Sequence, residues 1–320
     1  MSKHSRVQSN LEYLTTRLLL SGLGLLPRSV AVKAGLGMGH LAYRVSGGLK
    51  RTGRINLGLA YPELSEAERT RMLRGSFLNL GRLLGEFSQL PYATPESLRK
   101  FIVYDAPLER YKALKAEGRG VIFLTGHIGA WELLSIAHSV LEDPITIVVR
   151  PIDNPRIDRL VNDVRSKFGN KIIDKKNAAR QSLRVLREGG TLGILGDINT
   201  LPNEGVFVPF FGRLACTTAG VATLALRTNA AVFPVCGAWD HVQQRFVIHG
   251  DPEIELVRTG NLVNDIELNT ARFAKAIENL IRAYPDQWLW IHKRWRTQPE
   301  GMADPYSKSA QMVDPSKSSG

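Results

Sequence analysis

Short apolar segments alternate with longer amphipathic segments between about residue 118 and residue 284, and this alternation constrains the fold more than any other feature. The apolar segments are rich in β-branched residues and predict buried strands, whereas the amphipathic segments predict helices. The predicted strands are 121–125, 145–149, 171–173, 191–195 and 231–235, and the predicted helices are 131–141, 157–168, 178–188, 218–228 and 269–284. The pattern predicts an α/β fold with a mostly parallel central sheet flanked by helices. Ligands of such sheets bind beyond the carboxyl ends of the strands.

The first 60 residues are predicted to be helical and differ from the rest in charge. They hold nine Lys or Arg residues and one acidic residue, so they contribute +8 to a net charge of +12. This charge suits anionic lipid headgroups, nucleic acid or an acidic protein. The apolar run 18–26 is shorter than the roughly 20 residues of a membrane span, and Arg17 and Arg28 bracket it. We expect a retained helix that lies in the membrane interface. The alternatives are a buried first helix and a signal peptide, which Lys33 disfavours.

The predicted organisation has three parts: a membrane-contact region at 1–60, an α/β domain at 61–298 and a disordered tail at 299–320. The α/β domain opens on a capping box, in which Ser65 is the N-cap and Glu68 follows three residues later. The tail is rich in Ser, Pro, Lys and Gly, a composition typical of disorder. The two cysteines form no Cys-x-x-Cys motif, so we expect no structural zinc site. We also expect no other metal and no cofactor.

The segment Gly126-His-Ile-Gly-Ala-Trp-Glu132 follows the first predicted strand and leads into a helix. On one regular helix the side chains of His127 and Glu132 would point about 140° apart. In a strand-to-helix turn, which Gly126 and Gly129 permit, they can converge. A neutral imidazole held by a carboxylate is a general base. No Gly-x-Ser-x-Gly elbow supplies a serine nucleophile, so the base would act directly on a substrate hydroxyl. A histidine that merely caps the turn is the alternative.

Other short motifs surround this segment in a fixed order. They are Asn56 with Tyr61-Pro62, Gly118-Arg-Gly-Val-Ile122, Arg150 with Asn154-Pro155, Arg165 with Gly169, Asp197, Phe207-Val-Pro-Phe-Phe-Gly212, Thr217-Thr218 with Gly220, and Trp290-Ile-His292-Lys-Arg294-Trp295. Over roughly residues 10–298 the ordered set resembles the bacterial lipid A biosynthesis acyltransferases of the lauroyl and myristoyl type, a family that includes phosphatidylinositol mannoside acyltransferase. The chain departs from many members at Ala130, where they have asparagine, and in its short N-terminal apolar run.

The resemblance implies an enzyme that moves a fatty acyl chain from a thioester of acyl carrier protein or coenzyme A to a hydroxyl of a membrane glycolipid. It implies that His127 is the general base and that Glu132 orients it. Arg165 matches a family arginine near the active site, where it would steady charge on the thioester oxygen or hold a phosphate. A helix-surface arginine is the alternative.

The resemblance also implies a location and an acceptor. The location is the cytoplasmic face of the bacterial inner membrane, with the chain bound peripherally or anchored by its N-terminus. A lipid A precursor is the family's commonest acceptor, and a phosphoinositol mannoside or another polar lipid stays open. The acyl length and the choice between the two donors stay open as well.

Several other residues are candidates for supporting roles. Arg150 ends a predicted strand and would meet a substrate phosphate or form a salt bridge. Asp197 also ends a strand and would order the site or cap a turn. Residues 207–212 would form an apolar loop that walls an acyl channel or packs within the fold. The tryptophans and basic residues of 288–296 suit a membrane interface or a phosphosugar, or else a cationic surface over a buried tryptophan.

Two other classes of protein fit parts of the sequence. A basic lipid-binding or nucleic-acid-binding protein without catalysis would explain the charge. The sequence has no zinc knuckle and no RNP-like aromatic strand, so we expect no nucleic-acid partner. A hydrolase would use His127 and Glu132 to activate water and would release free fatty acid without an acceptor.

Overall fold

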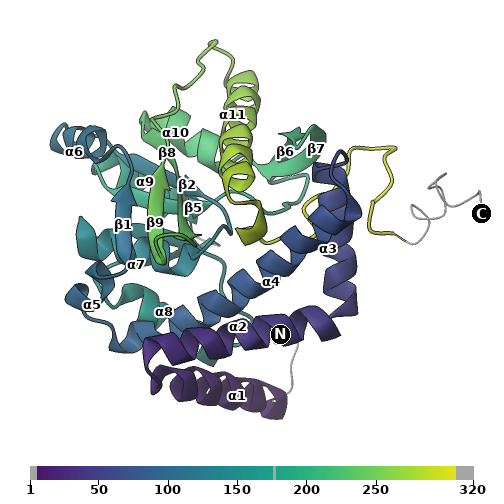
Figure 1. Ribbon diagram of the computed structural model, residues 1–320. Coiled ribbons are helices and arrows are strands. Elements are labelled where there is room, and N and C mark those ends of the chain that lie inside the picture. Colours follow the sequence, from purple (N-terminus) through teal and green to yellow (C-terminus); the bar gives the residue numbers. More distant parts are fainter. Residues whose placement is uncertain (1–5, 176–177, 308–320) are drawn as a thin grey trace, which may run out of the picture.

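The computed structural model describes residues 6–175 and 178–307, and a seven-stranded sheet lies at its centre (Figure 1). In spatial order the strands are β1 (Ile102–Asp105), β9 (Arg245–Gly250), β8 (Ala231–Asp240), β2 (Val121–Thr125), β5 (Thr191–Leu195), β3 (Thr146–Val149) and β4 (Lys171–Asp174). Neighbouring strands are parallel except for β8 and β9, which are antiparallel. The predicted sheet is therefore confirmed as mostly parallel.

Helices cover both faces of this sheet. The helices are α1 (Arg6–Gly24), α2 (Arg28–Val45), α3 (Gly47–Ala60), α4 (Glu66–Gln89), α5 (Pro95–Arg99), α6 (Leu108–Ala116), α7 (Trp131–Leu141), α8 (Pro155–Ser166), α9 (Ala178–Arg187), α10 (Gly220–Thr228) and α11 (Leu262–Ala283), with short 3₁₀ turns at Leu90–Tyr92 and Pro285–Gln287. Successive side chains of a strand point to opposite faces, so the sheet separates two cores. Ile122 of β2 belongs to the core under α9, α10 and α11, whereas Phe123 belongs to the core under α7 and α8.

The sequence did not predict β1, β9 or a separate two-stranded hairpin. This hairpin consists of β6 (Gly205–Phe210) and β7 (Arg213–Thr218), so the apolar loop expected at residues 207–212 is instead the end of one strand and the turn into the next. Pro209 and Gly212 favour a loop by local propensity. Burial of Val208 and Phe210 on one face, with Pro209 exposed between them, holds the segment as a strand.

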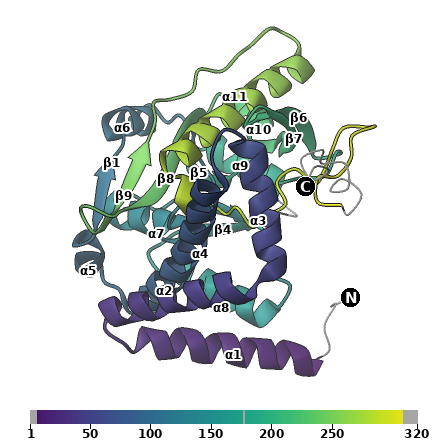
Figure 2. The ribbon, with the colours of Figure 1, turned by 45° about the vertical axis from the view of Figure 1, so that its right-hand side comes forward.

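The N-terminal helices pack on α4 and on one another at the lower end of the molecule (Figures 1 and 2). Glycines bring α2 and α4 into backbone contact: a Cβ on Gly35 would lie 2.2 Å from the carbonyl oxygen of Gly81. An ion pair of 2.6 Å between Arg28 and Glu86 joins the same two helices. Among residues 6–175 and 178–307, no helix combines the length and hydropathy that crossing a membrane requires.

The tryptophans of the C-terminal segment lie inside the fold, whereas Lys293 and Arg296 beside them are exposed. Trp288, Trp290 and Trp295 are at most 1% exposed, so the interpretation of these tryptophans as a membrane-facing surface is wrong. The amide of Asn56 donates to the backbone carbonyl of Trp290 at 2.6 Å. Tyr306 in turn donates its hydroxyl hydrogen to the side-chain oxygen of Asn56. Tyr306 falls within the predicted tail of 299–320 and is buried, and residues 308–320 lie outside the described residues.

Candidate active site

His127 lies in the turn that joins β2 to α7, at the carboxyl edge of the sheet. Gly129 makes the turn possible because its φ of 59° is in the left-handed region that favours glycine. Close packing also requires glycine there, since a Cβ on Gly129 would lie 2.1 Å from the carbonyl oxygen of Gly237. The backbone N–H of Leu289 donates to the carbonyl of His127 at 3.2 Å. The turn is thus held on one side by the sheet and on the other by the C-terminal segment.

Asp197, which follows β5, is the carboxylate that binds His127. Its Oδ1 lies 2.9 Å from the imidazole Nδ1, and its Oδ2 accepts the backbone N–H of His127 at 2.7 Å. Gly126 leaves the space for this approach, because a Cβ there would lie 3.0 Å from the Asp197 carboxyl carbon. Asp197 is 1% exposed and the His127 side chain is 23% exposed, so the imidazole is reachable while its partner is enclosed.

The two groups shift each other's pKa. Burial disfavours the imidazolium form of His127, but the Asp197 carboxylate outweighs burial and raises the pKa of His127. Burial would raise the pKa of Asp197, yet His127 and the hydrogen bonds from Trp288 and from the His127 backbone lower it. Asp197 therefore stays ionised at neutral pH and favours the tautomer of His127 that carries its proton on Nδ1.

Glu132 does not make the hydrogen bond to His127 that the sequence led us to expect. It stands in the first turn of α7 and faces α8, where Arg165 donates Nε to one carboxylate oxygen at 2.8 Å and Nη2 to the other at 2.6 Å. Such a two-point, charge-assisted pair with arginine is stronger than a single hydrogen bond to imidazole. Glu132 still raises the pKa of His127 through space, after burial and Asp197, while Arg165 lowers it. The four residues thus form one charged cluster.

Trp288 completes this cluster and was not assigned to the site from the sequence. Its indole Nε1 donates to Oδ2 of Asp197 at 2.8 Å, and both side chains are 1% exposed. The sequence did suggest Arg294, His292 and their neighbours as a surface. Instead Arg294 is 0% exposed and donates to the carbonyl of Cys216 at 2.7 Å. His292 Nε2 accepts the backbone N–H of Asn199 at 3.1 Å, two residues after Asp197.

Two expected contributors lie outside the cluster. Arg150 is exposed after β3, and within residues 6–175 and 178–307 no hydrogen bond or ion pair joins it to His127, Asp197, Glu132 or Arg165. Phe210 and Phe211 pack against Trp288 and so support the site from behind. The described ranges contain no group of three or more His, Cys, Asp or Glu side chains placed to hold a metal ion.

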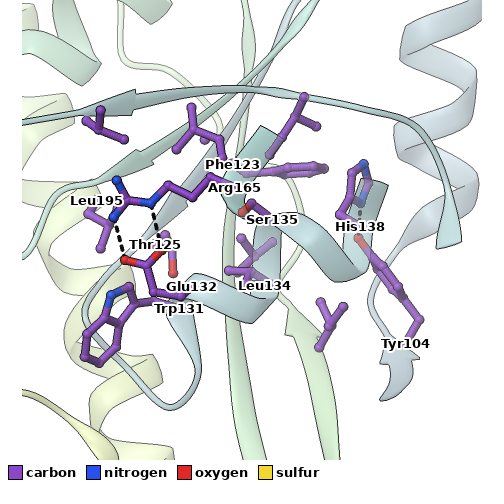
Figure 3. Close-up of a pocket in the computed structure, with 16 residues that line it drawn as sticks. Tyr104, Phe123, Thr125, Trp131, Glu132, Leu134, Ser135, His138, Arg165 and Leu195 are labelled. Carbon is purple, nitrogen blue, oxygen red and sulfur yellow. Dashed lines mark hydrogen bonds and ion pairs between the residues drawn. The ribbon is translucent and has the colours of Figure 1, made fainter. Parts of the chain in front are cut away.

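A narrow cavity of about 60 Å³ begins beside the Glu132–Arg165 pair and runs between α7 and the sheet (Figure 3). Trp131, Leu134, Ser135 and His138 line it from one face of α7, at the spacing of neighbouring helical turns. The sheet lines it with alternate residues of each strand, which share a face because side chains repeat every second position. These are chiefly Phe123, Thr125, Ile145, Ile147, Val149, Leu195, Val235 and Ile248. The lining is mostly apolar, so the cavity suits a hydrocarbon chain.

Comparison with known proteins identifies the class of enzyme. Residues 2–297 match the model of the bacterial lipid A biosynthesis acyltransferases. The lipid A biosynthesis lauroyltransferase of Escherichia coli (strain K12) is 28% identical over 292 residues, which cover 88% of this chain and 90% of that protein. The lipid A biosynthesis myristoyltransferase of the same strain is 24% identical over 289 residues, covering 90% and 88%. The lipid A biosynthesis palmitoleoyltransferase is 26% identical over 304 residues, covering 92% and 97%.

The chain is therefore an acyltransferase. It belongs to the bacterial lipid A biosynthesis acyltransferase family, as the order of its motifs predicts.

Proposed function

We propose that the enzyme transfers a fatty acyl chain from a thioester of acyl carrier protein or coenzyme A to a hydroxyl of a lipid A precursor. The relatives are named as transferases of lauroyl, myristoyl and palmitoleoyl groups in lipid A biosynthesis, and the family match spans nearly the whole chain. The observation that carries the proposal is an accessible imidazole backed by a buried carboxylate, beside an apolar cavity. A base and a hydrocarbon site are the two things that acyl transfer to an alcohol requires.

In the proposed mechanism His127 is the general base. With Nδ1 bonded to Asp197, the other ring nitrogen, Nε2, accepts the proton of the acceptor hydroxyl. The hydroxyl oxygen then attacks the thioester carbonyl carbon, forming the new C–O bond. The C–S bond breaks, and the departing sulfur takes the proton back from Nε2, so the enzyme returns to its starting state. Asp197 stabilises the transient imidazolium throughout, as the carboxylate does in a Ser-His-Asp triad.

Glu132 and Arg165 have a supporting role in this mechanism. The Arg165 side chain lines the cavity beside Glu132 and also influences His127 electrostatically. Placed there, it stabilises the negative charge that develops on the thioester oxygen. Glu132 holds the guanidinium by two hydrogen bonds and contributes a second negative charge near the imidazole. Glu132 therefore affects His127 through its negative charge and by positioning Arg165, rather than by a hydrogen bond to the imidazole.

An N-terminal surface on α1 supports binding to the cytoplasmic face of the inner membrane, where such an acceptor resides. Val7, Leu11, Leu14 and Leu18 lie on one face of α1 and are between 52% and 77% exposed. We call this set the α1 apolar face. Arg17 lies beside it, and the surrounding N-terminal region is strongly basic. Apolar and basic side chains together favour a helix lying on an anionic bilayer.

The test is acyl transfer by the purified protein, followed by mass spectrometry of the lipid. Acyl-carrier-protein and coenzyme A thioesters serve as donors, with a lipid A precursor and a phosphatidylinositol mannoside as alternative acceptors. We expect the lipid A precursor to gain an acyl chain, and His127→Ala to slow the transfer by roughly 10²–10⁴. His241→Ala, whose side chain is 66% exposed, is the matched control and keeps the rate. Acylation of the phosphatidylinositol mannoside alone would exclude a lipid A precursor as the acceptor. Release of free fatty acid alone would favour a hydrolase.

A further inference from the structure

A glycine interrupts the apolar sequence of a central strand. Gly193 is the middle residue of β5, is buried, and pairs with Phe123 of β2 on one side and Ile147 of β3 on the other. Glycine weakens a strand interior and often marks a place where a ligand approaches the backbone. Apart from the residues next to Gly193 in the chain, a Cβ added there would have one atom of the described residues within 4 Å, the Cδ1 of Ile145 at 3.2 Å. Because Gly193 lines the cavity, its missing side chain is part of the open space.

A polar pair closes the opposite end of the same cavity. The Tyr104 hydroxyl from β1 and Nδ1 of His138 from α7 are 2.5 Å apart (Figure 3). Nε2 of His138 lies 3.4 Å from the Tyr111 hydroxyl, which donates to Asp143 at 2.6 Å. His138 is 2% exposed, so a chain that pushed past it would leave buried polar groups without partners. The Tyr104–His138 pair is therefore a firm end to an otherwise apolar channel.

The distance between the two ends is fixed by α7. Glu132 stands at the reacting end and His138 six residues further along the helix, which corresponds to about 9 Å at 1.5 Å per residue. The cavity of about 60 Å³ holds a few water molecules, so side chains such as Leu134 and Ile145 must move aside when a longer chain enters. The Tyr104–His138 pair at the far end cannot move in the same way. Tyr104 belongs to β1, and His138 is also within hydrogen-bond distance of Tyr111, which donates to Asp143.

We infer that Gly193 and the Tyr104–His138 pair determine which acyl-chain length the enzyme prefers. Gly193 keeps the middle of the channel open, and the Tyr104–His138 pair stops the chain at its methyl end. The inference rests on the proposed function, because it takes the acyl group of the donor as the occupant of the cavity. It goes beyond that function by assigning chain-length selectivity to three residues that take no part in the transfer chemistry.

The test is a competition among donors from octanoyl to palmitoyl thioesters, with the products resolved by mass spectrometry. We expect Gly193→Val to move the preference toward shorter chains by about one two-carbon step or more, because its side chain fills the channel. Gly193→Ala is the milder version, for use if the valine variant does not fold. Tyr104→Ala and His138→Ala should move the preference toward longer chains. Circular dichroism and thermal unfolding show which variants are folded.

Ile136→Ala is the matched control, because Ile136 is a fully buried residue of the same helix that does not line the cavity. It should keep the wild-type chain preference even if it lowers stability. The inference is overturned if the folded Gly193 and Tyr104 variants keep the wild-type preference, or if Ile136→Ala changes the preference as much as they do. Failure of the proposed function looks different: no variant, including wild type, would then transfer an acyl chain.

Discussion

Nδ1 of His127 lies 2.9 Å from Oδ1 of Asp197, although 70 residues separate the two along the chain. The contact exists because β2 and β5 are adjacent parallel strands, so the residues that follow them meet at one edge of the sheet. It gives the imidazole a buried anion at one nitrogen and leaves the other nitrogen for substrate. This pair, rather than a pairing of His127 with Glu132, is the centre of the proposed chemistry.

The rate should fall as the pH drops through the pKa of His127, because a protonated imidazole cannot accept the hydroxyl proton. Burial disfavours the imidazolium form of His127, and Arg165 disfavours it to a smaller degree. The negative charges of Asp197 and Glu132 outweigh both effects, so the pKa of His127 lies above its usual value of about 6.5. The acidic limb of the kcat/KM profile should therefore lie above about pH 6.5. Glu132→Gln removes one raising charge and should move the limb to lower pH. A limb that stays in place would contradict this assignment.

Trp288 should influence the rate through Asp197. Trp288→Phe keeps an aromatic side chain but removes the indole N–H that donates to Oδ2 of Asp197. The carboxylate then becomes more basic and holds the imidazolium more tightly, so the acidic limb should move to higher pH and the rate at a fixed pH below the limb should fall. Trp290→Phe is the matched control, because the indole of Trp290 donates to the carbonyl of Pro285 instead. Equal shifts in both variants would mean that Trp288 has only a packing role.

The Glu132–Arg165 pair should be coupled in stability. The side chains are 18% and 14% exposed, so removing either partner leaves the other charge mostly buried. Allowing for residual solvent screening, we expect Glu132→Gln and Arg165→Met each to lower the free energy of unfolding by about 1–3 kcal/mol. The double variant should lose less than the sum, as urea titrations would measure. The exposed Arg184–Glu188 pair is the control and should show no coupling, and strict additivity at Glu132–Arg165 would contradict the prediction.

The α1 apolar face should bind anionic membranes. We expect the double variant Leu14→Glu, Leu18→Glu to reduce binding to phosphatidylglycerol-containing vesicles by more than tenfold, since each buried leucine contributes about 1.5–3 kcal/mol. Val263→Glu is the control: Val263 is 77% exposed at the start of α11, at the opposite end of the molecule from α1 (Figures 1 and 2). Vesicle sedimentation measures both variants. Unchanged binding of the α1 variant would exclude this face as the membrane contact.

Much of the α/β domain was predictable because its signals are local. Each of the five apolar runs predicted as strands is a strand, and the capping box of Ser65 and Glu68 begins α4 as expected. The missed strands β1 and β9 are stabilised by pairing with each other, and β9 also pairs with β8. Such pairing depends on long-range contacts that leave little trace in the residues themselves.

For the site, the local part was predictable from the sequence and the part that depends on long-range contacts was not. The turn that carries His127 follows from glycines within a few residues of it. The partner of His127 depends instead on strand order, which places β5 beside β2 and so brings Asp197 to the imidazole. Asp197 was a candidate because it ends a predicted strand, and knowledge of that order would have been enough to choose it. Trp288 gave no signal beyond its membership of an aromatic segment, since its role requires the C-terminal chain to lie against the turn after β2, where Leu289 donates its N–H to the carbonyl of His127.

The rate of acyl transfer by Asp197→Asn, measured in a single turnover at saturating donor, tests whether Asp197 is the partner of the catalytic imidazole. The asparagine keeps the size of the side chain but removes the charge that stabilises the imidazolium and favours its productive tautomer. We expect the rate to fall by roughly 10²–10⁴, with thermal unfolding measured alongside and the exposed Asp163→Asn as control. A folded Asp197→Asn enzyme that works at the wild-type rate would exclude Asp197 as the partner of His127 in catalysis.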